Sequence, residues 1–430
     1  MAADNLRVLF VLRYGLPSER LRANMLASLV QQRSTFFEQQ LHIRSIEART
    51  VNWPQSWSYG AGQLQSHSVC EELRGQTNDL RHRLELLRSW QPNVISFVKL
   101  PPLEPFWRNQ FPQALLVVDV VDNVALIRQL MERTRHTGGC SFDLALVQTN
   151  ATRQLLHSSS NPSTRAMRVA VIPHQHTNFG DWRVRTPGRR RPQTVGILIG
   201  SKWQHPSADE LLKLAQACCP LELTLAVFFE RQEEANKPNA AGGPQTTVTR
   251  FECAGTHVAR RSSASASQRA GVLVSSRGAR PYADDVVFNF SEQALYNDVS
   301  WVNEVNIGLL WPPGTNLDDL PHRPPTRLLF WWSHGIPAIF FPYAAYSEVA
   351  TRFGYRLPNG ALPQARSVAE FHAMAAAFVA YAALRTHLSS VGLEASRHFS
   401  VESIAAQYLS AIREHVQTNT TYRPRRPLAV

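Results

Sequence analysis

The stretch that decides the fold of this chain runs from Arg323 to Glu348 and reads RPPTRLLFWWSHGIPAIFFPYAAYSE. Proline suits the first turn of a helix, where its missing N–H costs no hydrogen bond, so Pro325 favours a helix start. The apolar residues that follow predict a helix with one thick buried face. Gly335 fits the left-handed residue that ends many helices, and a proline follows it closely.

The residues after this helix predict a buried strand and then a second helix. Ala338 to Phe341 is a continuous apolar run, as expected of a parallel strand that is covered on both faces. Pro342 ends the strand because it cannot donate to a sheet ladder, and a new helix is expected to start near Ala344. The stretch therefore predicts helix, turn, strand and helix at one edge of a parallel sheet.

Polar residues gather where the first of these helices is expected to begin, at Arg323, Thr326 and Arg327. Bare backbone amides, the positive end of the helix dipole and planar guanidinium groups together make a site for a diphosphate. The alternative interpretation is a capped amphipathic helix whose arginines are simply solvated.

The order of these features resembles the donor half of GT-B glycosyltransferases of the group 1 type. The resemblance rests on a basic residue, a Pro-x-Thr-Arg sequence, an apolar helix, a Gly-x-Pro turn, an apolar strand and a Tyr-x-Glu sequence. It implies that Arg323 and Arg327 hold a nucleotide diphosphate and that Glu348 binds the ribose hydroxyls. Many retaining members carry an acidic residue where this chain has Phe340 or Phe341, so the resemblance assigns no stereochemical course.

A second strand tip adds to the expected donor site. The strand that begins at Thr194 ends in a Gly-Ser pair, where the backbone can approach a phosphate closely. The predicted donor-binding residues are Gly200, Ser201, Arg323, Thr326, Arg327, Tyr346 and Glu348.

Strands and helices alternate along both halves of the chain, which predicts the α/β class. We expect two Rossmann-like, doubly wound parallel-sheet domains that face each other across a cleft. The expected parts are an acceptor-side domain (1–178), a basic linker (179–192), a donor domain with a flexible insertion at about 230–280 (193–400), and a C-terminal helix and tail (401–430). The resemblance suggests that this last helix crosses back to the first domain.

Local sequence patterns predict the individual strands and helices. Strands are expected at Leu6–Leu12, Leu41–Ile46, Asn93–Val98, Leu115–Val121, Phe142–Gln148, Arg168–Ile172, Thr194–Ser201 and Leu221–Phe229. The segment from Glu230 to Ser267 has little apolar surface to bury, so it is expected to be largely unstructured, with Thr247–Cys253 as a candidate strand within it. Helices at Val368–Leu388 and Val401–His415 are expected to close the chain.

The carboxyl ends of the first-half strands carry the candidate catalytic and acceptor-side residues, because ligands of doubly wound sheets bind there. Asp122 is the candidate that takes the acceptor proton, and His174 is a second catalytic candidate. The alternative interpretations are an acidic helix cap and an ordinary surface histidine. The expected acceptor-side residues are Tyr14, Gly15, Arg20 and Asn123.

The amino-acid composition limits the classes of partner expected for this chain. A hydrophobic content of 44% and a charged content of 18% describe a globular chain. The net charge of +12 comes almost entirely from arginine, which we attribute to coding bias, so no nucleic-acid partner is expected. The N-terminal apolar run is too short for a signal peptide and no run is long enough to span a membrane. We therefore expect a cytoplasmic protein, with peripheral membrane contact still open.

The expected function is metal-independent glycosyl transfer from a nucleotide-diphosphate sugar to an unknown acceptor, either a glycan, a lipid or a small molecule. Arginines and helix dipoles can carry the charge of the leaving diphosphate, so no cofactor or metal is expected, and no Asp-x-Asp donor motif stands out. The alternatives are a non-catalytic nucleotide-sugar-binding protein and, ranked last, an RNA-binding protein that uses the linker arginines.

Overall fold

The computed structural model describes residues 5–12, 20–52, 78–99, 104–120, 142–158, 167–176, 192–199, 206–230, 246–254, 257–264, 300–312 and 323–418. The chain forms two compact units. The first combines Met1–His174 with Val401–Val430, and the second is Gln175–Ser400.

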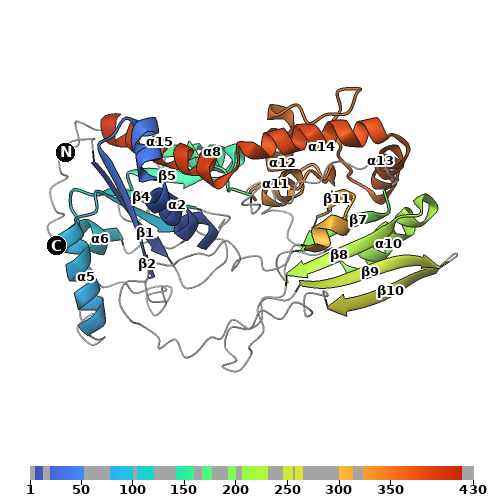
Figure 1. Ribbon diagram of the computed structural model, residues 1–430, viewed down its shortest axis with the longest axis horizontal. Coiled ribbons are helices and arrows are strands. Elements are labelled where there is room, and N and C mark those ends of the chain that lie inside the picture. The colour runs from blue at the N-terminus through green and yellow to red at the C-terminus, as the bar shows by residue number, and fades with distance from the viewer. Residues whose placement is uncertain are drawn as a thin grey trace. The chain divides into compact units, whose positions relative to one another are not determined.

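The first unit is built on a six-stranded parallel sheet in the order β2-β1-β3-β4-β5-β6 (Figure 1). Its strands are β1 (Asn5–Leu12), β2 (Ser45–Asn52), β3 (Val94–Val98), β4 (Leu115–Asp119), β5 (Leu144–Val147) and β6 (Arg168–Val171). Every residue of β3, β4 and β5 is buried. These strands read as continuous apolar runs because both faces of the sheet are covered.

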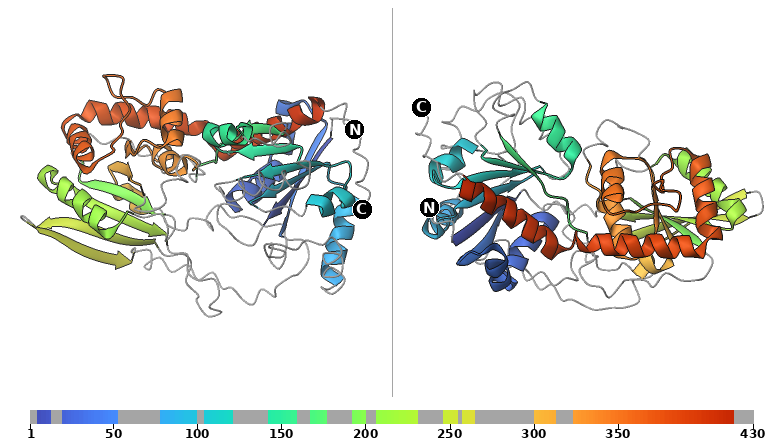
Figure 2. Two further views of the ribbon diagram at one scale, coloured as in Figure 1. Left: turned by 180° about the vertical axis from the view of Figure 1, so that it is seen from behind. Right: turned by 90° about the horizontal axis from the view of Figure 1, so that it is seen from above.

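Helices of the first unit come from both ends of the sequence. They are η1 (Arg20–Asn24), α2 (Met25–Gln32), α3 (Ser34–Leu41), α5 (Asn78–Trp90), α6 (Glu104–Gln110), α8 (Asn150–His157) and α15 (Val401–Thr418). The C-terminal helix α15, drawn in red, lies against the strands of this unit (Figure 2), and the rings of Phe10 and Tyr408 are 5.7 Å apart. The last helix of the chain therefore completes the core of the first unit.

One strand prediction in this unit is wrong. The strand expected at Leu41–Ile46 begins later, at Ser45, because α3 continues to Leu41. Phe37 and Leu41 are both buried, one helical turn apart, whereas Ile46 and Ala48 alternate with exposed residues. The helical period thus persists up to Leu41, and the period of a strand starts only after it.

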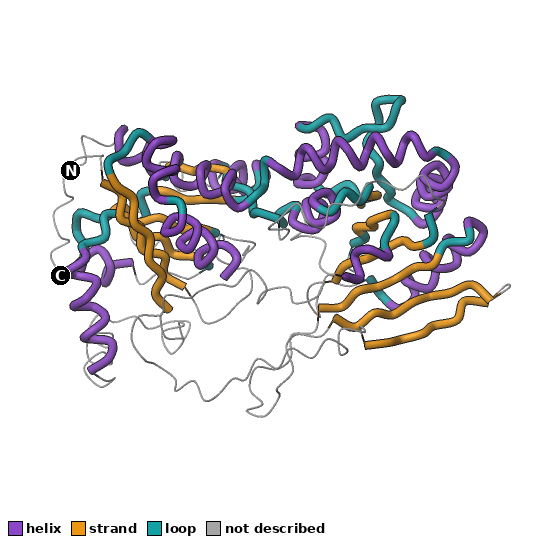
Figure 3. The backbone as a smooth tube through the Cα atoms, in the orientation of Figure 1, coloured by secondary structure: helices purple, strands orange, loops and turns teal. Residues whose placement is uncertain are grey.

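The second unit contains a six-stranded sheet in the order β10-β9-β8-β7-β11-β12. Its strands are β7 (Thr194–Ile199), β8 (Thr224–Glu230), β9 (Thr246–Ala254), β10 (His257–Ala264), β11 (Ile307–Leu310) and β12 (Ala338–Phe340). The β8-β7-β11-β12 part is parallel, whereas β9 and β10 are antiparallel and form one outer edge (Figure 3). The α/β prediction is confirmed, and the second sheet is mixed rather than purely parallel.

The β9–β10 hairpin occupies part of the segment that the sequence predicts to be largely unstructured. β9 coincides with the candidate strand Thr247–Cys253. Its apolar residues pair with β8, where Leu225 lies opposite Phe251. Pairing with the buried strand β8 therefore lets β9 bury apolar surface that the segment alone could not bury.

The helices of the second unit are α10 (Ala208–Cys218), η4 (Cys219–Leu221), η6 (Ser300–Glu304), α11 (Thr326–Ser333), α12 (Ala344–Arg352), α13 (Val368–Ala380) and α14 (Ala382–Arg397). The single helix predicted at Val368–Leu388 is two helices, bent by 102° at Tyr381. Arg385 donates to the carbonyl oxygens of Phe378 and Val379. This guanidinium satisfies acceptors that a continuous helix would have bonded itself.

Two glycines let α11 pack directly on the sheet. Gly196 and Gly308 are register partners on β7 and β11, and the buried Trp331 indole lies over both. A Cβ atom at Gly308 would be 2.5 Å from Cγ of Trp331, and one at Gly196 would be 3.1 Å from its Cη2. The next residue of α11, Trp332, packs against Gly392 of α14. A side chain larger than hydrogen at Gly196 or Gly308 would push α11 off the sheet.

Among the described residues, no single helix is both long and apolar enough to cross a membrane, although the bent pair of α13 and α14 has the length and composition when taken together.

Candidate functional site

The second sheet has a topological switch point between β7 and β11. From β7, the chain continues on one side to β8 and returns later on the other side as β11. In open α/β sheets, ligands bind beyond the carboxyl ends of the strands at such a point. The carboxyl ends of β7, β11 and β12 are therefore the place where a ligand site is expected in this unit.

The N-termini of three helices lie at this edge, because α10, α11 and α12 each follow one of these parallel strands. The start of α10 is closed by a capping box, in which Ser207 and Glu210 each accept from the other's backbone N–H. Within the described residues, the N-cap residues of α11 and α12, Pro325 and Tyr343, make no side-chain cap hydrogen bond. Their first-turn amides remain able to bind an anion.

Two arginines accompany these uncapped helix starts. Arg323 and Arg327 flank the start of α11, and their charges act on the phenols of Tyr343 and Tyr346 at the start of α12. Burial raises the pKa of Tyr346, and the charges of Arg327 and Arg323 oppose that shift. Burial also raises the pKa of Tyr343, the Tyr346 phenol adds to that shift, and the same two arginines oppose it. Arg323, Arg327, Tyr343 and Tyr346 thus form one cluster, which we call the α11–α12 cluster.

The predicted donor residues Thr326, Tyr346 and Glu348 take different positions on α11 and α12. Thr326 is the first residue of α11 and is half-buried. Tyr346 is 6% exposed and packs on Phe340, with ring centroids 6.0 Å apart. Glu348 is half-buried two residues further along α12, about 200° around the helix axis. Tyr346 and Glu348 therefore do not project from the same face of α12.

Several predicted site residues lie outside the described part of the chain: Tyr14, Gly15, Asp122, Asn123, Gly200 and Ser201. Arg20 is described only as the first residue of η1. In the described residues, no group of three His, Cys, Asp or Glu side chains could hold a metal ion.

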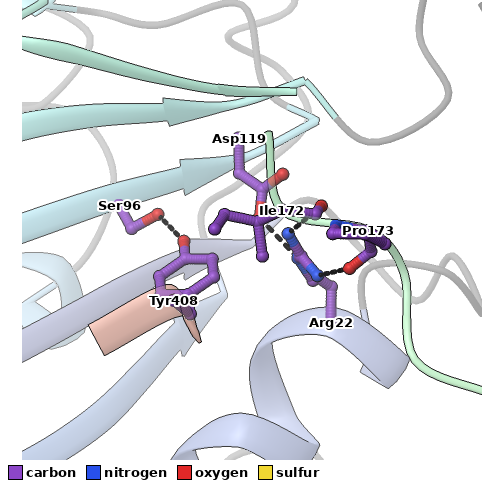
Figure 4. A network of polar contacts seen from close by, with 6 residues as sticks. All are labelled: Arg22, Ser96, Asp119, Ile172, Pro173 and Tyr408. Carbon is purple, nitrogen blue, oxygen red and sulfur yellow. Dashed lines mark hydrogen bonds and ion pairs between the residues drawn. The ribbon is translucent and has the colours of Figure 1, made fainter. Parts of the chain in front are cut away.

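The first unit has a buried polar network at the carboxyl edge of its sheet (Figure 4). Arg22 donates through Nε to Asp119 at 2.7 Å, through Nη1 to the Pro173 carbonyl at 2.7 Å, and through Nη2 to the Ile172 carbonyl at 3.0 Å. The Tyr408 ring lies 5.1 Å from the guanidinium carbon, and its hydroxyl is 2.5 Å from that of Ser96. The network joins η1, β3, β4, the chain after β6, and α15.

His174 follows this network directly and is only 3% exposed. Three further residues of the first unit have buried polar atoms without a hydrogen-bond partner among the described residues: Gln148, through its amide after β5, Asn24, through Oδ1, and Arg7, through Nε. The sequence did not single out Arg22, Asn24 or Gln148. Asp119 lies within the strand predicted at Leu115–Val121, but its pairing with an arginine far away in sequence was not predicted.

Comparison with solved structures indicates the fold of this chain. The chain resembles the crystal structure of a glycosyltransferase from Rickettsia africae ESF-5, with a TM-score of 0.50 and 8% sequence identity, over 96% of this chain and 99% of that one. No protein-family model matches the sequence, and no curated protein matches it.

Two larger solved chains are also similar. The GtfA/B complex matches with a TM-score of 0.44 and 16% identity, over 79% of this chain and 60% of that chain. The pneumococcal O-GlcNAc transferase GtfA in complex with UDP and GlcNAc matches with a TM-score of 0.41 and 12% identity, over 77% and 59%. This chain thus spans less than two thirds of either one. Together with the two α/β units, the likeness to the Rickettsia structure confirms the predicted GT-B fold.

Proposed function

We propose that this chain is a glycosyltransferase that moves a sugar from a nucleotide-diphosphate sugar to an acceptor without the help of a metal ion. The observation that carries the proposal is the α11–α12 cluster. Two guanidinium groups lie beside two uncapped helix starts at the switch point of the second sheet. Backbone amides, helix dipoles and guanidinium groups in that arrangement suit a diphosphate.

In this proposal the donor lies along the carboxyl edge of the second sheet. Arg323 and Arg327 bind the diphosphate, and Thr326 adds its amide and hydroxyl. Glu348 binds the ribose hydroxyls, and Tyr346 supports the wall of the site from the core side. Gly200 and Ser201 complete the phosphate contacts with their backbone.

The proposed reaction breaks one bond and forms one. An acceptor oxygen forms a bond to the anomeric carbon while the bond from that carbon to the diphosphate breaks, and the acceptor proton passes to a carboxylate. We assign that carboxylate to Asp122, keep His174 as the second catalytic candidate, and assign Tyr14, Gly15, Arg20 and Asn123 to the acceptor side. Asp119 is less suitable as a base, because its carboxylate is buried against the Arg22 guanidinium.

The donor class is tested by thermal unfolding against a panel of sugar nucleotides and free nucleoside diphosphates. A ligand at ten times its Kd stabilises the protein by about 1.4 kcal/mol, which is readily measured. Stabilisation by a nucleoside diphosphate but not by the matching nucleoside is the expected result. If no member of the panel raises Tm, the proposal is wrong.

Catalysis is tested separately from binding, and with it the alternative of a non-catalytic nucleotide-sugar-binding protein. The best-binding sugar nucleotide is incubated with the protein, and release of free nucleoside diphosphate is followed with and without EDTA. We expect slow release that EDTA does not change, since the arginines carry the leaving-group charge. Tight binding with no release would favour the non-catalytic alternative, and loss of release in EDTA would contradict metal independence.

A further inference from the structure

Tyr343 holds a fixed position at the carboxyl edge of β12. It is the N-cap residue of α12 and has an extended backbone with φ −70° and ψ 144°. Its own N–H donates to the Phe341 carbonyl at 2.7 Å, and its carbonyl accepts from Ser347 N–H at 2.9 Å. Because hydrogen bonds hold the backbone on both sides, the direction in which the side chain leaves the chain is set by β12 and α12 together.

The ring of Tyr343 is packed, but its hydroxyl is not satisfied. The ring centroid lies 5.3 Å from that of Phe341 and 5.2 Å from that of Tyr346. Its Oη atom is buried and has no hydrogen-bond partner in the described chain. A phenylalanine would make the same ring contacts without burying an unsatisfied hydroxyl, which costs free energy. The hydroxyl therefore stands out as a group that lacks its partner.

A second donor of the same cluster is also unsatisfied. Nε of Arg323 is buried and has no hydrogen-bond partner among the described residues, and the Arg323 charge acts on the Tyr343 phenol. Glu210 also acts on this phenol, but its carboxylate accepts from both the backbone N–H and the hydroxyl of Ser207. The cluster thus offers hydrogen-bond donors and positive charge, and the acceptor it lacks is an anionic oxygen.

The protonation state of Tyr343 agrees with this role. Burial, the largest effect, raises the pKa of its phenol, and the two arginines oppose that shift only in part. The phenol is therefore neutral at physiological pH and has an O–H to donate.

We infer that the Tyr343 hydroxyl and the Arg323 Nε–H donate to oxygen atoms of the diphosphate, which makes Tyr343 a donor-binding residue of the site. The inference rests on the proposed function, because it takes the anion to be the diphosphate of the sugar nucleotide. It adds a neutral hydrogen-bond donor to a site otherwise built from arginines and backbone amides. The hydroxyl acts on the diphosphate and leaves recognition of the base and the ribose unchanged.

The experiment is calorimetric titration of the parent protein and of Tyr343→Phe with UDP, GDP, ADP, dTDP and inorganic pyrophosphate. We expect Tyr343→Phe to weaken the best of these ligands about tenfold, as for loss of a hydrogen bond to a charged group. Its Tm without ligand should not fall, because the variant loses only an unsatisfied hydroxyl. The matched control is Tyr381→Phe, which removes the hydroxyl of a tyrosine that is 65% exposed in the same unit, and it should bind as the parent does.

A second variant of the same cluster keeps the test valid if Tyr343→Phe fails to fold. Arg323→Lys keeps the positive charge but lacks the planar donor group, so it should also weaken diphosphate binding while Tm stays close to the parent value. If the parent binds a diphosphate and Tyr343→Phe binds it equally well, the inference is overturned and the proposed function stands. If the parent binds none of the five ligands, both fail.

Discussion

Arg22 and Asp119 form an ion pair of 2.7 Å in which neither side chain has any exposed surface. The same guanidinium also donates to the carbonyls of Ile172 and Pro173, so its charge is shared among three acceptors. Moving both charges out of water is costly, and hydrogen bonds from all three guanidinium nitrogens offset that cost. Arg22 thereby fixes the chain just where it leaves the first sheet.

Removing one partner of this pair should be strongly destabilising. Arg22→Ala would leave the Asp119 carboxylate buried without its guanidinium and the two carbonyls without donors. We expect a loss of about 3–5 kcal/mol in the free energy of unfolding of the first unit, measured by urea unfolding. The double variant Arg22→Met with Asp119→Leu should recover part of this loss, because no charge is stranded.

An exposed ion pair of the same unit is the control for this prediction. Arg33 and Glu402 are 3.7 Å apart and their side chains are 55% and 42% exposed. Arg33→Ala should change the free energy of unfolding by less than about 1 kcal/mol. Equal losses in Arg22→Ala and Arg33→Ala would contradict the account of the buried network.

The contact between Gly308 and Trp331 predicts a second effect on stability. Gly308→Ala should destabilise the second unit by about 1–3 kcal/mol, because the new methyl group would overlap the indole. With Trp331→Leu in the same chain, the loss should be smaller than the sum of the two single losses by more than about 1 kcal/mol. Gly360→Ala is the control, since its φ of 82° is strained but no atom lies within 4 Å, and its cost should simply add to that of Trp331→Leu.

Arg327 is the sharpest test of the proposed donor site. If it binds the diphosphate, Arg327→Ala should weaken nucleoside diphosphate binding by roughly tenfold or more. Arg327→Lys should recover only part of the affinity, because lysine restores the charge without the planar fork. Calorimetric titration measures both, and Arg397→Ala, an exposed arginine of the same unit, serves as the control. Normal affinity in Arg327→Ala would place the donor elsewhere.

His415 of α15 should make the stability of the first unit depend on pH. Burial, the largest effect, lowers the pKa of His415, the Arg168 charge lowers it further, and Asp143 opposes the shift. Above the unfolded-state pKa of about 6.5 the imidazole is neutral in both states and adds no pH dependence. As the pH falls below that value, the unfolded chain takes up a proton that the folded His415 resists, so stability falls until the lower folded pKa is passed.

His415→Gln should therefore flatten the loss of stability between about pH 7 and pH 5, measured as the urea midpoint at each pH. Parallel curves for the parent and for His415→Gln would contradict the assignment.

Local signals in the sequence predicted the organising stretch well. Pro325 and Pro342 restrict the backbone at their own positions, and Gly335 permits the left-handed conformation that ends a helix. The helix starts and the strand follow from them. Gly335 indeed has a φ of 67°. The break at Tyr381 was not predicted, because it depends on where the Arg385 guanidinium finds carbonyl acceptors. That is a property of the folded chain.

The candidate site was predictable only in part, for the same reason. Helix starts and arginines can be read from sequence, so Arg323 and Arg327 were found. Tyr343 was missed because nothing local indicates that its hydroxyl is buried without a partner. The same holds for Arg22 and Asp119, which are 97 positions apart. Pairing across such a separation leaves no periodic pattern in a single sequence.

The hydrogen bond between Ser96 and Tyr408 has a consequence for the order of events during synthesis. It joins residues 312 positions apart. When only the six strands of the first unit have been made, α15 does not yet exist. The Ser96 hydroxyl and the surface that α15 covers therefore cannot be buried at that stage. The ribosome must first make the chain from Val171 to Val401, which at about 5–20 residues per second takes on the order of 10–50 s. The whole second unit, Gln175–Ser400, is made within that interval, so its chain is complete before α15 exists. The N-terminal unit is therefore the last to have its whole chain available for folding.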